Sequence, residues 1–387
     1  MESAPAIYLD YNATTPVRPE VLEEMTRVSR VAFGNPGSRH AAGRAARQVL
    51  EASRETLAAL LGAQPREVVF TSGGTESINL AIQGLCGRRG GDVVAPEGEH
   101  PATVAALRRV GSSATAGASF RRLLLPIDSH GQVVGDSLDS LPWPEVRLVT
   151  LLLAHNETGV IQNVGPLAER CRAEQVPLHI DAVQAVGKIP VDFVSLGATA
   201  LSLGAHKFYG PRGIGALLIK AGVTLPPLLV GGHQEQGRRA GTECVSLAAG
   251  MALALELWHR EQAEVTTRLT ALRDRLQAGL VAACPPTVVI GAESRRLPNT
   301  LNLAFPQCDG EALLVALDLA GVCCSLGGTC ASGAATVSPI LGAMGLPAEL
   351  HRSCLRLSVG RENTIAEIDD AIVRITRSVQ RQRRPKS

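Results

Sequence analysis

Short apolar runs, each bounded by glycine or polar residues, recur along the chain between residues 67 and 219. Helical apolar spacing fills several of the intervals between them, as at residues 76–85 and 166–174. Because short strands that alternate with helices form βαβ units, this pattern predicts an α/β fold with a mostly parallel sheet. The runs are residues 67–70, 92–95, 121–125, 146–154, 177–180, 200–203 and 215–219.

The remaining segments predict helices ahead of this region and a smaller unit after it. Residues 19–29 and 43–61 have helical spacing, and residues 244–283 form a long amphipathic stretch without proline, which predicts one or two helices. Beyond it we expect an α+β unit, and a solvated, frayed end at the basic residues 381–386. The elements expected in this unit are strands at 287–291 and 300–305 and helices at 311–319 and 365–377.

Composition excludes several classes of protein. With 45% hydrophobic residues among 387, the chain can bury a sizeable core, which excludes disorder for most of it. Aromatic residues are only 3% of the chain, which argues against base-stacking platforms for single-stranded nucleic acid. A net charge of +2 is too balanced for a dedicated polyanion binder, so we expect no direct contact with nucleic acid.

Nine cysteines are too sparse for a disulfide scaffold, and none forms a C-x-x-C pair, so no metal site is predicted. No apolar run approaches the roughly 18 residues of a membrane span, and the first residues lack the basic and apolar regions of a signal peptide. We therefore expect a cytoplasmic protein without membrane association, whose thiols are free for chemistry.

Polar segments follow four of the apolar runs, and parallel strands bring such segments to one edge of the sheet. Residues 71–77 carry two glycines and open a helix, as in an anion cradle. Asn156, Asp181 and Lys207 follow three later runs. Each segment alone is also typical of a helix start or a polar loop. Together, a cradle, an amide, a carboxylate and a lysine suit pyridoxal phosphate, which needs a lysine, a carboxylate at its ring nitrogen and a phosphate site.

The chain resembles the NifS-like cysteine desulfurases, which have the class V aminotransferase fold. The resemblance implies a homodimer with fold type I: an N-terminal arm (1–15) packing with the small domain, a large cofactor-binding α/β domain (16–258), and a small α+β domain (259–387). It rests on motifs in the family's order and spacing, which begin at Tyr8, Gly34, Thr71, Asn156, His179, His206, Gly241, Arg295 and Arg356.

The resemblance also implies residue roles. Lys207 matches the Schiff-base lysine, Asp181 the partner of the ring nitrogen, and Gln184 the residue that bonds the ring hydroxyl. His100 matches the imidazole that stacks on the ring. This imidazole is also expected to serve as an acid or base, with a pKa in the useful range. The phosphate contacts match Gly74, Thr75, His206 and, from the other subunit, Thr242; the substrate contacts match Asn35, Asn156 and Arg356. A guanidinium suits a substrate carboxylate because its planar donors bind it bidentately.

A glycine-rich segment at residues 321–333 carries Cys330, which matches the family's persulfide cysteine. A cysteine on such a segment can be exposed, whereas most cysteines behave as small buried hydrophobes; Cys323 and Cys324, on its apolar side, are expected in the core. The implied reaction converts L-cysteine to alanine, with sulfur passing to Cys330 and then to an acceptor, such as a scaffold for iron–sulfur cluster assembly.

The sequence departs from the family at Gly204, where a serine usually donates to the phosphate, at Cys244, where asparagine is usual, and in the residues before Cys330. Selenocysteine lyase and another class V lyase or aminotransferase remain alternative activities. An iron–sulfur or metal-binding protein that uses Cys323, Cys324 and Cys330 is the non-enzymatic alternative, and the absence of C-x-x-C spacing counts against it.

Overall fold

The computed structural model describes residues 5–87, 90–112, 120–327 and 338–383. Its main feature is a seven-stranded sheet with the order β2-β8-β7-β6-β5-β3-β4. Strand β8 runs antiparallel to both of its neighbours, and the other adjacent pairs are parallel. The strands are β2 (Val68–Thr71), β3 (Gly91–Pro96), β4 (Phe120–Leu125), β5 (Val146–Leu152), β6 (Leu178–Asp181), β7 (Ala200–Gly204) and β8 (Gly215–Ile219).

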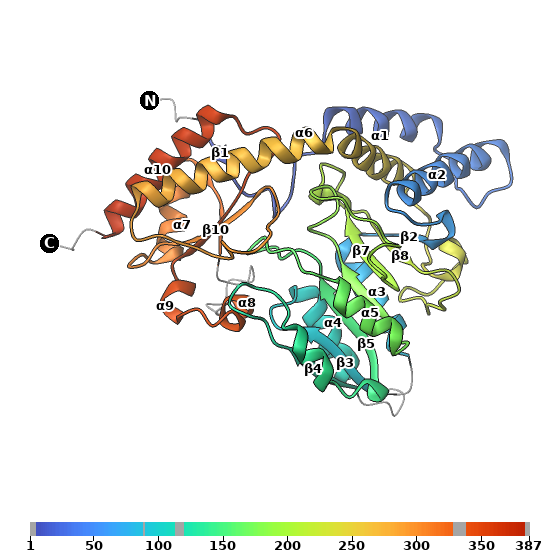
Figure 1. The fold of residues 1–387 in the computed structure, drawn as a ribbon. Helices are drawn as coiled ribbons and strands as arrows, with labels where there is room; N and C mark the ends of the chain where they lie inside the picture. The colour runs from blue at the N-terminus through green and yellow to red at the C-terminus, as the bar shows by residue number, and fades with distance from the viewer. Residues whose placement is uncertain (1–4, 88–89, 113–119, 328–337, 384–387) are drawn as a thin grey trace.

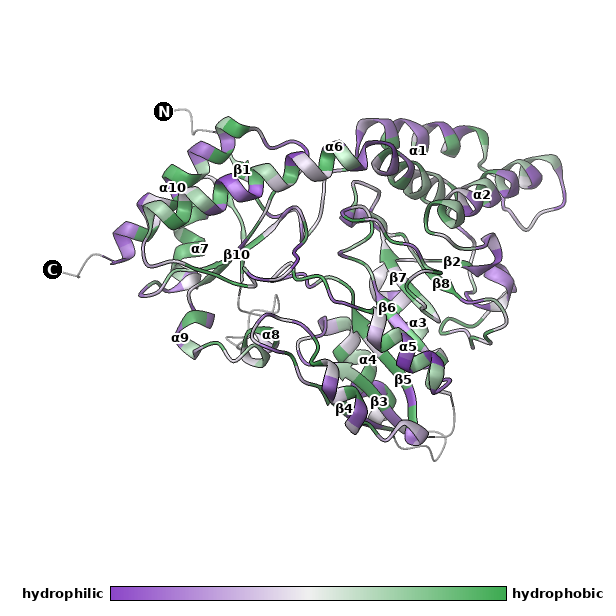
Figure 2. Cartoon of the chain, viewed as in Figure 1, coloured by the Kyte–Doolittle hydropathy of each residue, from purple (hydrophilic) through white to green (hydrophobic). Residues whose placement is uncertain are grey.

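Helices pack on this sheet because each presents an apolar stripe. In α2, for example, Ala46, Leu50 and Leu57 are fully buried at positions that share one helix face. Figure 2 shows hydrophobic colour along the central strands and hydrophilic colour over much of α1. The helices of this unit are α1 (Pro19–Val31), α2 (Ala41–Leu60), α3 (Gly74–Leu85), α4 (Pro101–Ser112) and α5 (Gly165–Ala173).

A second, four-stranded antiparallel sheet has the order β12-β13-β10-β9. The N-terminal strand β1 lies beside this unit, because Ile7 and Tyr8 pair in parallel with β11. The strands are β1 (Ile7–Tyr8), β9 (Val288–Val289), β10 (Thr300–Ala304), β11 (Val322–Cys323), β12 (Ser325–Leu326) and β13 (Cys354–Ser358). The helices are α7 (Gly310–Leu319), α8 (Pro339–Ala343), α9 (Ala348–His351) and α10 (Ile365–Arg383).

One helix of 39 residues, α6 (Val245–Ala283), runs from the first unit to the second (Figure 1). Its N-terminal half contributes Met251 and Leu255 to the core beside the large sheet. Its C-terminal half contributes Leu272 and Leu276 to a separate core around β10 and β13. The predicted boundary at residue 258 stays a prediction, because this continuous helix contributes to both cores.

The predicted α/β fold with a mostly parallel sheet is confirmed. The stretch at 244–283 is one helix rather than two. The last helix is longer than predicted, because it continues to Arg383. The expectation of a frayed end is therefore wrong for residues 381–383. The side chain of Arg383 donates hydrogen bonds to the backbone oxygens of Pro306, Cys284 and Pro286, which ties down the end of α10. Across the described ranges, no helix has the length and apolar character needed to cross a membrane.

Candidate active site

The carboxyl edge of the large sheet brings together three of the predicted groups. Strand β6 ends at Asp181, and Lys207 ends the short 3₁₀ helix η5 (Ala205–Lys207) that follows β7. Because β6 and β7 are parallel neighbours, with Asp181 opposite Ser202, both side chains leave the sheet at the same edge. Strand β2 is parallel to β7 across β8, so the start of α3 lies at this edge too.

Lys207 is half-buried, and the N-terminal segment holds its amine. Its Nζ donates hydrogen bonds to the backbone oxygens of Asn12, at 2.6 Å, and Ala13, at 2.8 Å. Burial and then the charge of Arg356 lower the pKa of Lys207 to about 8, against the smaller opposing effect of Asp10 and Asp181. The amine is therefore far more often unprotonated near neutral pH than an ordinary lysine.

Asp181 and Gln184 are both buried beside Lys207. The backbone amide of Val183 donates to Asp181 Oδ1 at 3.0 Å, and burial raises the pKa of this carboxyl to about 6. A cationic partner beside the carboxyl would lower that pKa again. The amide of Gln184 donates from Nε2 to the Asn12 oxygen at 2.9 Å and accepts from Lys188 Nζ at 2.5 Å.

The start of α3 forms the predicted anion cradle. Gly73 precedes the helix with a φ of 152°, a conformation that other residues rarely adopt. A Cβ on Gly74 would lie 2.6 Å from Val183 Cγ2, so only glycine lets the helix start pack against the loop that carries Asp181. A Cβ on Gly204 would lie 3.4 Å from the Gly74 nitrogen, which is ordinary contact. The free amides and dipole of the helix start favour an anion here.

Two histidines border the site. His100 precedes α4 and accepts the Ala102 amide at Nδ1, at 3.1 Å. His206 Nδ1 lies 3.2 Å from Thr14 Oγ1. Burial, followed by the charge of Lys207, lowers the pKa of each histidine to about 4. Both rings are therefore neutral near pH 7. For His100, a pKa of about 4 lies below the useful range expected from the sequence.

Arg356 lies on β13, so the second sheet supplies this part of the site. Its NH2 donates to Asp10 Oδ1 at 2.7 Å, and its NH1 donates to the backbone oxygen of Asn156 at 3.2 Å. Its Nε is buried without a hydrogen-bond partner in the part of the chain that the structure describes. An unsatisfied guanidinium donor of this kind suits an incoming carboxylate.

The structure places the remaining predicted residues differently from one another. Asn35 is exposed in the loop between α1 and α2, where its Oδ1 accepts the Gly37 amide. Thr75 lies within the cradle and is exposed. Thr242 is also exposed and lines a cavity of about 190 Å³ that includes Ser72 and Arg239. Cys330 lies outside the described residues. The predicted roles of all these residues stay predictions.

Sequence reasoning missed several residues of the site. Asn12 connects to Lys207, Gln184, Lys188 and, through its Nδ2, Thr300. Its place inside the N-terminal motif was a usable signal, whereas nothing local marked Lys188. Glu99, beside His100, was a further omission: it is buried, and its pKa is raised to about 8, mainly by desolvation.

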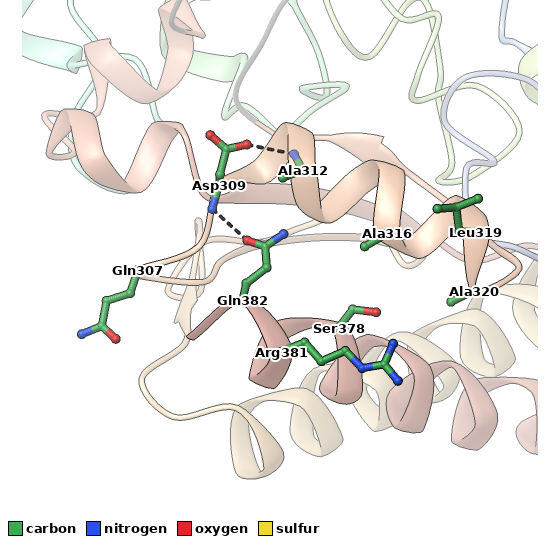
Figure 3. Close-up of a pocket in the computed structure, with 9 residues that line it drawn as sticks. All are labelled: Gln307, Asp309, Ala312, Ala316, Leu319, Ala320, Ser378, Arg381 and Gln382. Carbon is green, nitrogen blue, oxygen red and sulfur yellow. Dashed lines mark hydrogen bonds between the residues drawn. The ribbon is translucent and has the colours of Figure 1, made fainter. Parts of the chain in front are cut away.

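The second unit contains the neighbouring cysteines Cys323 and Cys324 and a groove. Cys323 and Cys324 are half-buried, and burial raises the pKa of Cys324 to about 12. In the described ranges, no three His, Cys, Asp or Glu side chains gather as a metal site would require. A groove of about 660 Å³ between α7 and α10 includes Ala316, Leu319 and Arg381 (Figure 3). None of the predicted site residues that the structure describes lines it.

Comparison with known proteins assigns the family. Residues 7–370 match the model of the class-V aminotransferases. A cysteine desulfurase of Nostoc sp. is 40% identical over 381 residues, 97% of this chain and 94% of the relative. The cysteine desulfurase IscS of Methanosarcina thermophila is 39% identical over 381 residues, 98% of this chain and 93% of the relative.

Solved structures agree. A NifS-like protein superposes with a TM-score of 0.88 at 33% identity, covering 96% of this chain and 98% of that protein. DndA from Streptomyces lividans superposes with a TM-score of 0.74 at 36% identity, covering 91% of this chain and 99% of its own. The resemblance inferred from the motifs is confirmed. The chain belongs to the class-V aminotransferase family, and its similarity to cysteine desulfurases extends over almost its whole length.

Proposed function

We propose that this cysteine desulfurase binds pyridoxal 5'-phosphate through Lys207, takes L-cysteine as its substrate, and passes the sulfur through a persulfide on Cys330 to an acceptor. The relatives named as cysteine desulfurases support the reaction. The observation that carries the site assignment is the meeting of Lys207, Asp181 and the start of α3 at one edge of the large sheet.

The residues present fit pyridoxal phosphate. The glycine start of α3 offers backbone amides to a phosphate, and Gly74 has no room for a Cβ. The buried carboxyl of Asp181 would pair with the ring nitrogen, and the amine of Lys207 has the lowered pKa that a nucleophile needs. When bound, this group supplies an aldehyde for amines and a ring that takes up the electrons released at the substrate Cα.

Lys207 and Arg356 would receive the amino acid. The guanidinium of Arg356 binds the substrate carboxylate through its unpartnered Nε, while its NH2 stays on Asp10. The amine of Lys207, whose pKa burial lowers, takes the Cα proton at Nζ. His100 is neutral and accepts at Nδ1, so its proton sits on Nε2, from which it can be exchanged with substrate or thiol.

Cys330 would accept the sulfur. Its thiolate attacks the substrate sulfur, the carbon–sulfur bond breaks, and a sulfur–sulfur bond forms on the enzyme. The substrate carbon takes up a proton, so cysteine and one enzyme thiol become alanine and one enzyme persulfide, with atoms and electrons in balance. An acceptor protein, such as an iron–sulfur scaffold, then takes the outer sulfur.

The enzyme would act as a homodimer in the cytoplasm. Phe33 and Val230 are 77% and 85% exposed, and the second copy would cover apolar side chains of this kind. Thr242 is exposed near the start of α3, as a residue serving a second copy would be. The eight described cysteines are free thiols, which suits a reducing compartment.

Spectroscopy and product analysis test the proposal. Purified wild type with added cofactor should show a visible absorbance band that Lys207→Ala lacks, and borohydride reduction followed by peptide mapping should place the adduct on Lys207. Lys220→Ala, at an exposed position, is the matched control. An unchanged band in Lys207→Ala would remove the assignment.

A second experiment addresses the sulfur. Wild type should release alanine and sulfide from cysteine with a reducing agent, and mass spectrometry should find an extra sulfur on the peptide containing Cys330. Cys330→Ser should lose desulfuration of cysteine and keep cofactor binding. Continued turnover of cysteine at the wild-type rate would exclude the role of Cys330, and preferred turnover of selenocysteine would indicate a lyase instead.

A further inference from the structure

Lys188 is a buried lysine that no step above uses. It lies in the turns that follow β6 and is 5% exposed. Its Nζ donates to Asn12 Oδ1 at 2.7 Å and to Gln184 Oε1 at 2.5 Å. Burial, with the charges of Lys207 and Arg356, lowers the pKa of Lys188 well below its ordinary range. Both acceptors are neutral, so among the described residues no carboxylate bonded to this amine offsets the cost of burying it.

Both acceptors belong to the candidate active site. Gln184 presents its Oε1 to Lys188, and its Nε2 therefore faces the other way, where it donates to the Asn12 oxygen at 2.9 Å. The same backbone oxygen accepts from Lys207 Nζ at 2.6 Å. A lysine amine donates hydrogen bonds, so it favours the Oε1 end of the Gln184 amide over the Nε2 end. Lys188 therefore decides which end of this amide faces it.

Asn12 is oriented in the same way. Its Oδ1 accepts from Lys188 and also from Asn299 Nδ2, at 3.1 Å. Its Nδ2 donates to Thr300 Oγ1 at 2.9 Å. Lys188 thus joins the loop after β6 to Asn12 and fixes the direction of two side-chain amides, of which that of Gln184 shares the backbone oxygen of Asn12 with Lys207.

We propose that Lys188 is a positioning residue, whose Nζ holds the carbonyl ends of Gln184 and Asn12 so that Gln184 keeps its Nε2 donor for the ring oxygen of pyridoxal phosphate. The inference rests on the proposed function, in which Gln184 bonds that oxygen. A hydrogen-bond donor stabilises negative charge on the ring oxygen and so favours the deprotonated form of the bound cofactor. Loss of the fixed amide donor therefore raises the pKa of the bound cofactor.

A double-mutant cycle on the cofactor-loaded protein tests the inference. Lys188→Met should raise the pH midpoint of the visible-absorbance titration by about half a unit or more, and Gln184→Met should raise it at least as far. If Lys188 acts through Gln184, the double variant should shift no further than Gln184→Met alone. The control is Lys220→Met, because Lys220 is exposed. The pH midpoint of this variant should equal that of wild type.

Two results would overturn the inference: an unshifted midpoint in Lys188→Met, or a double variant whose shift is the sum of the two single shifts. Should Lys188→Met not fold, Lys188→Gln replaces it. Its shorter amide retains a donor but brings an acceptor oxygen against Asn12 and Gln184, so a smaller shift in the same direction is expected. A wild-type midpoint in Lys188→Gln would equally exclude the role.

Thermal unfolding of the cofactor-free chain separates this inference from the proposed function. The effects of Lys188→Met and Gln184→Met on the unfolding midpoint should be non-additive, because the two side chains share a hydrogen bond. If wild type never shows a cofactor band, the proposed function fails while this coupling still appears. If the band is present and the coupling is absent, the role of Lys188 fails alone.

Discussion

Arg356 on β13 and Asp10 on the N-terminal segment form an ion pair, with Arg356 NH2 2.7 Å from Asp10 Oδ1. Both side chains are largely buried, and Ser325 Oγ donates to the same carboxylate oxygen at 2.9 Å. Asp10 therefore fixes the guanidinium in the second sheet and offsets part of the effect of its charge on Lys207. The pair leaves Nε of Arg356 as the donor available for a substrate.

Asp10→Asn should destabilise the cofactor-free chain, because it leaves a largely buried guanidinium without its counter-charge. We expect the free energy of unfolding to fall by about 1–3 kcal/mol, as measured by urea denaturation. Asp274→Asn is the matched control, since Asp274 is half exposed in its pair with Arg273 and should cost less than about 0.5 kcal/mol. Equal losses for the two variants would contradict the importance of the buried pair.

Arg356→Lys should raise the KM for cysteine by about tenfold or more with a smaller change in kcat, because lysine has no counterpart of the Nε donor that Arg356 offers to the substrate carboxylate while its NH2 stays on Asp10. Steady-state kinetics with cysteine provide the measurement. Arg352→Lys, at an exposed position just before β13, should leave KM unchanged. A loss confined to kcat would show that Arg356 serves a later step and not substrate binding.

Gly74→Ala should weaken cofactor binding, because the new Cβ would lie 2.6 Å from Val183 Cγ2 and push the helix start away from the Asp181 loop. Equilibrium dialysis should find an affinity lower by about tenfold, the equivalent of about 1.4 kcal/mol. Adding Val183→Ala should recover much of it. Gly135→Ala, where a Cβ meets nothing within 4 Å, is the control. Failure of Val183→Ala to recover affinity would exclude this steric cause.

Gly204→Ser should slow release of the cofactor. A Cβ at this position meets only ordinary contacts, 3.4 Å from the Gly74 nitrogen, so a serine fits and adds a hydroxyl beside the cradle. One added hydrogen bond to a charged group is worth about 1.5–3 kcal/mol, and the release rate should fall at least several-fold. Stopped-flow transfer to an apo-enzyme trap measures it. Gly204→Ala, which lacks the hydroxyl, should not show the effect.

Glu99→Gln should change how stability depends on pH. Burial raises the pKa of Glu99 to about 8 in the folded chain, whereas an unfolded glutamate titrates near its ordinary value. The folded state therefore binds more protons between those values, and wild type loses stability as pH rises towards 8. Glutamine avoids this loss and can still accept the Leu152 amide that Oε1 now accepts at 2.7 Å.

Urea denaturation of the cofactor-free protein at pH 5.5, 7 and 8.5 checks this prediction. The variant should gain on wild type by up to a few kcal/mol at the highest pH. Glu97→Gln, two residues earlier and half-buried, controls for the loss of one carboxylate. Parallel pH curves for wild type and Glu99→Gln would mean that Glu99 is not held protonated.

Local patterns determined much of the fold. The alternation of short apolar runs with helical stretches located all seven strands of the large sheet, with every end within two residues. Strand β13 was not located from its pattern, because the alternation of Leu355 and Leu357 with Arg356 and Ser358 extends over only four residues, too short a run to stand out as a strand. Its arginine entered only through the family motif.

The sequence by itself determined which groups are present: a glycine-rich helix start, and a carboxylate and a lysine that each follow a strand, because these signals lie within a few neighbouring residues. Only the tertiary structure decided their surroundings. The contacts of Asn12 with Lys207 and Lys188, and of Asp10 with Arg356, join residues far apart along the chain. The burial that shifts the pKa values of Lys207, His100 and Glu99 likewise arises from packing between elements, which no local pattern records.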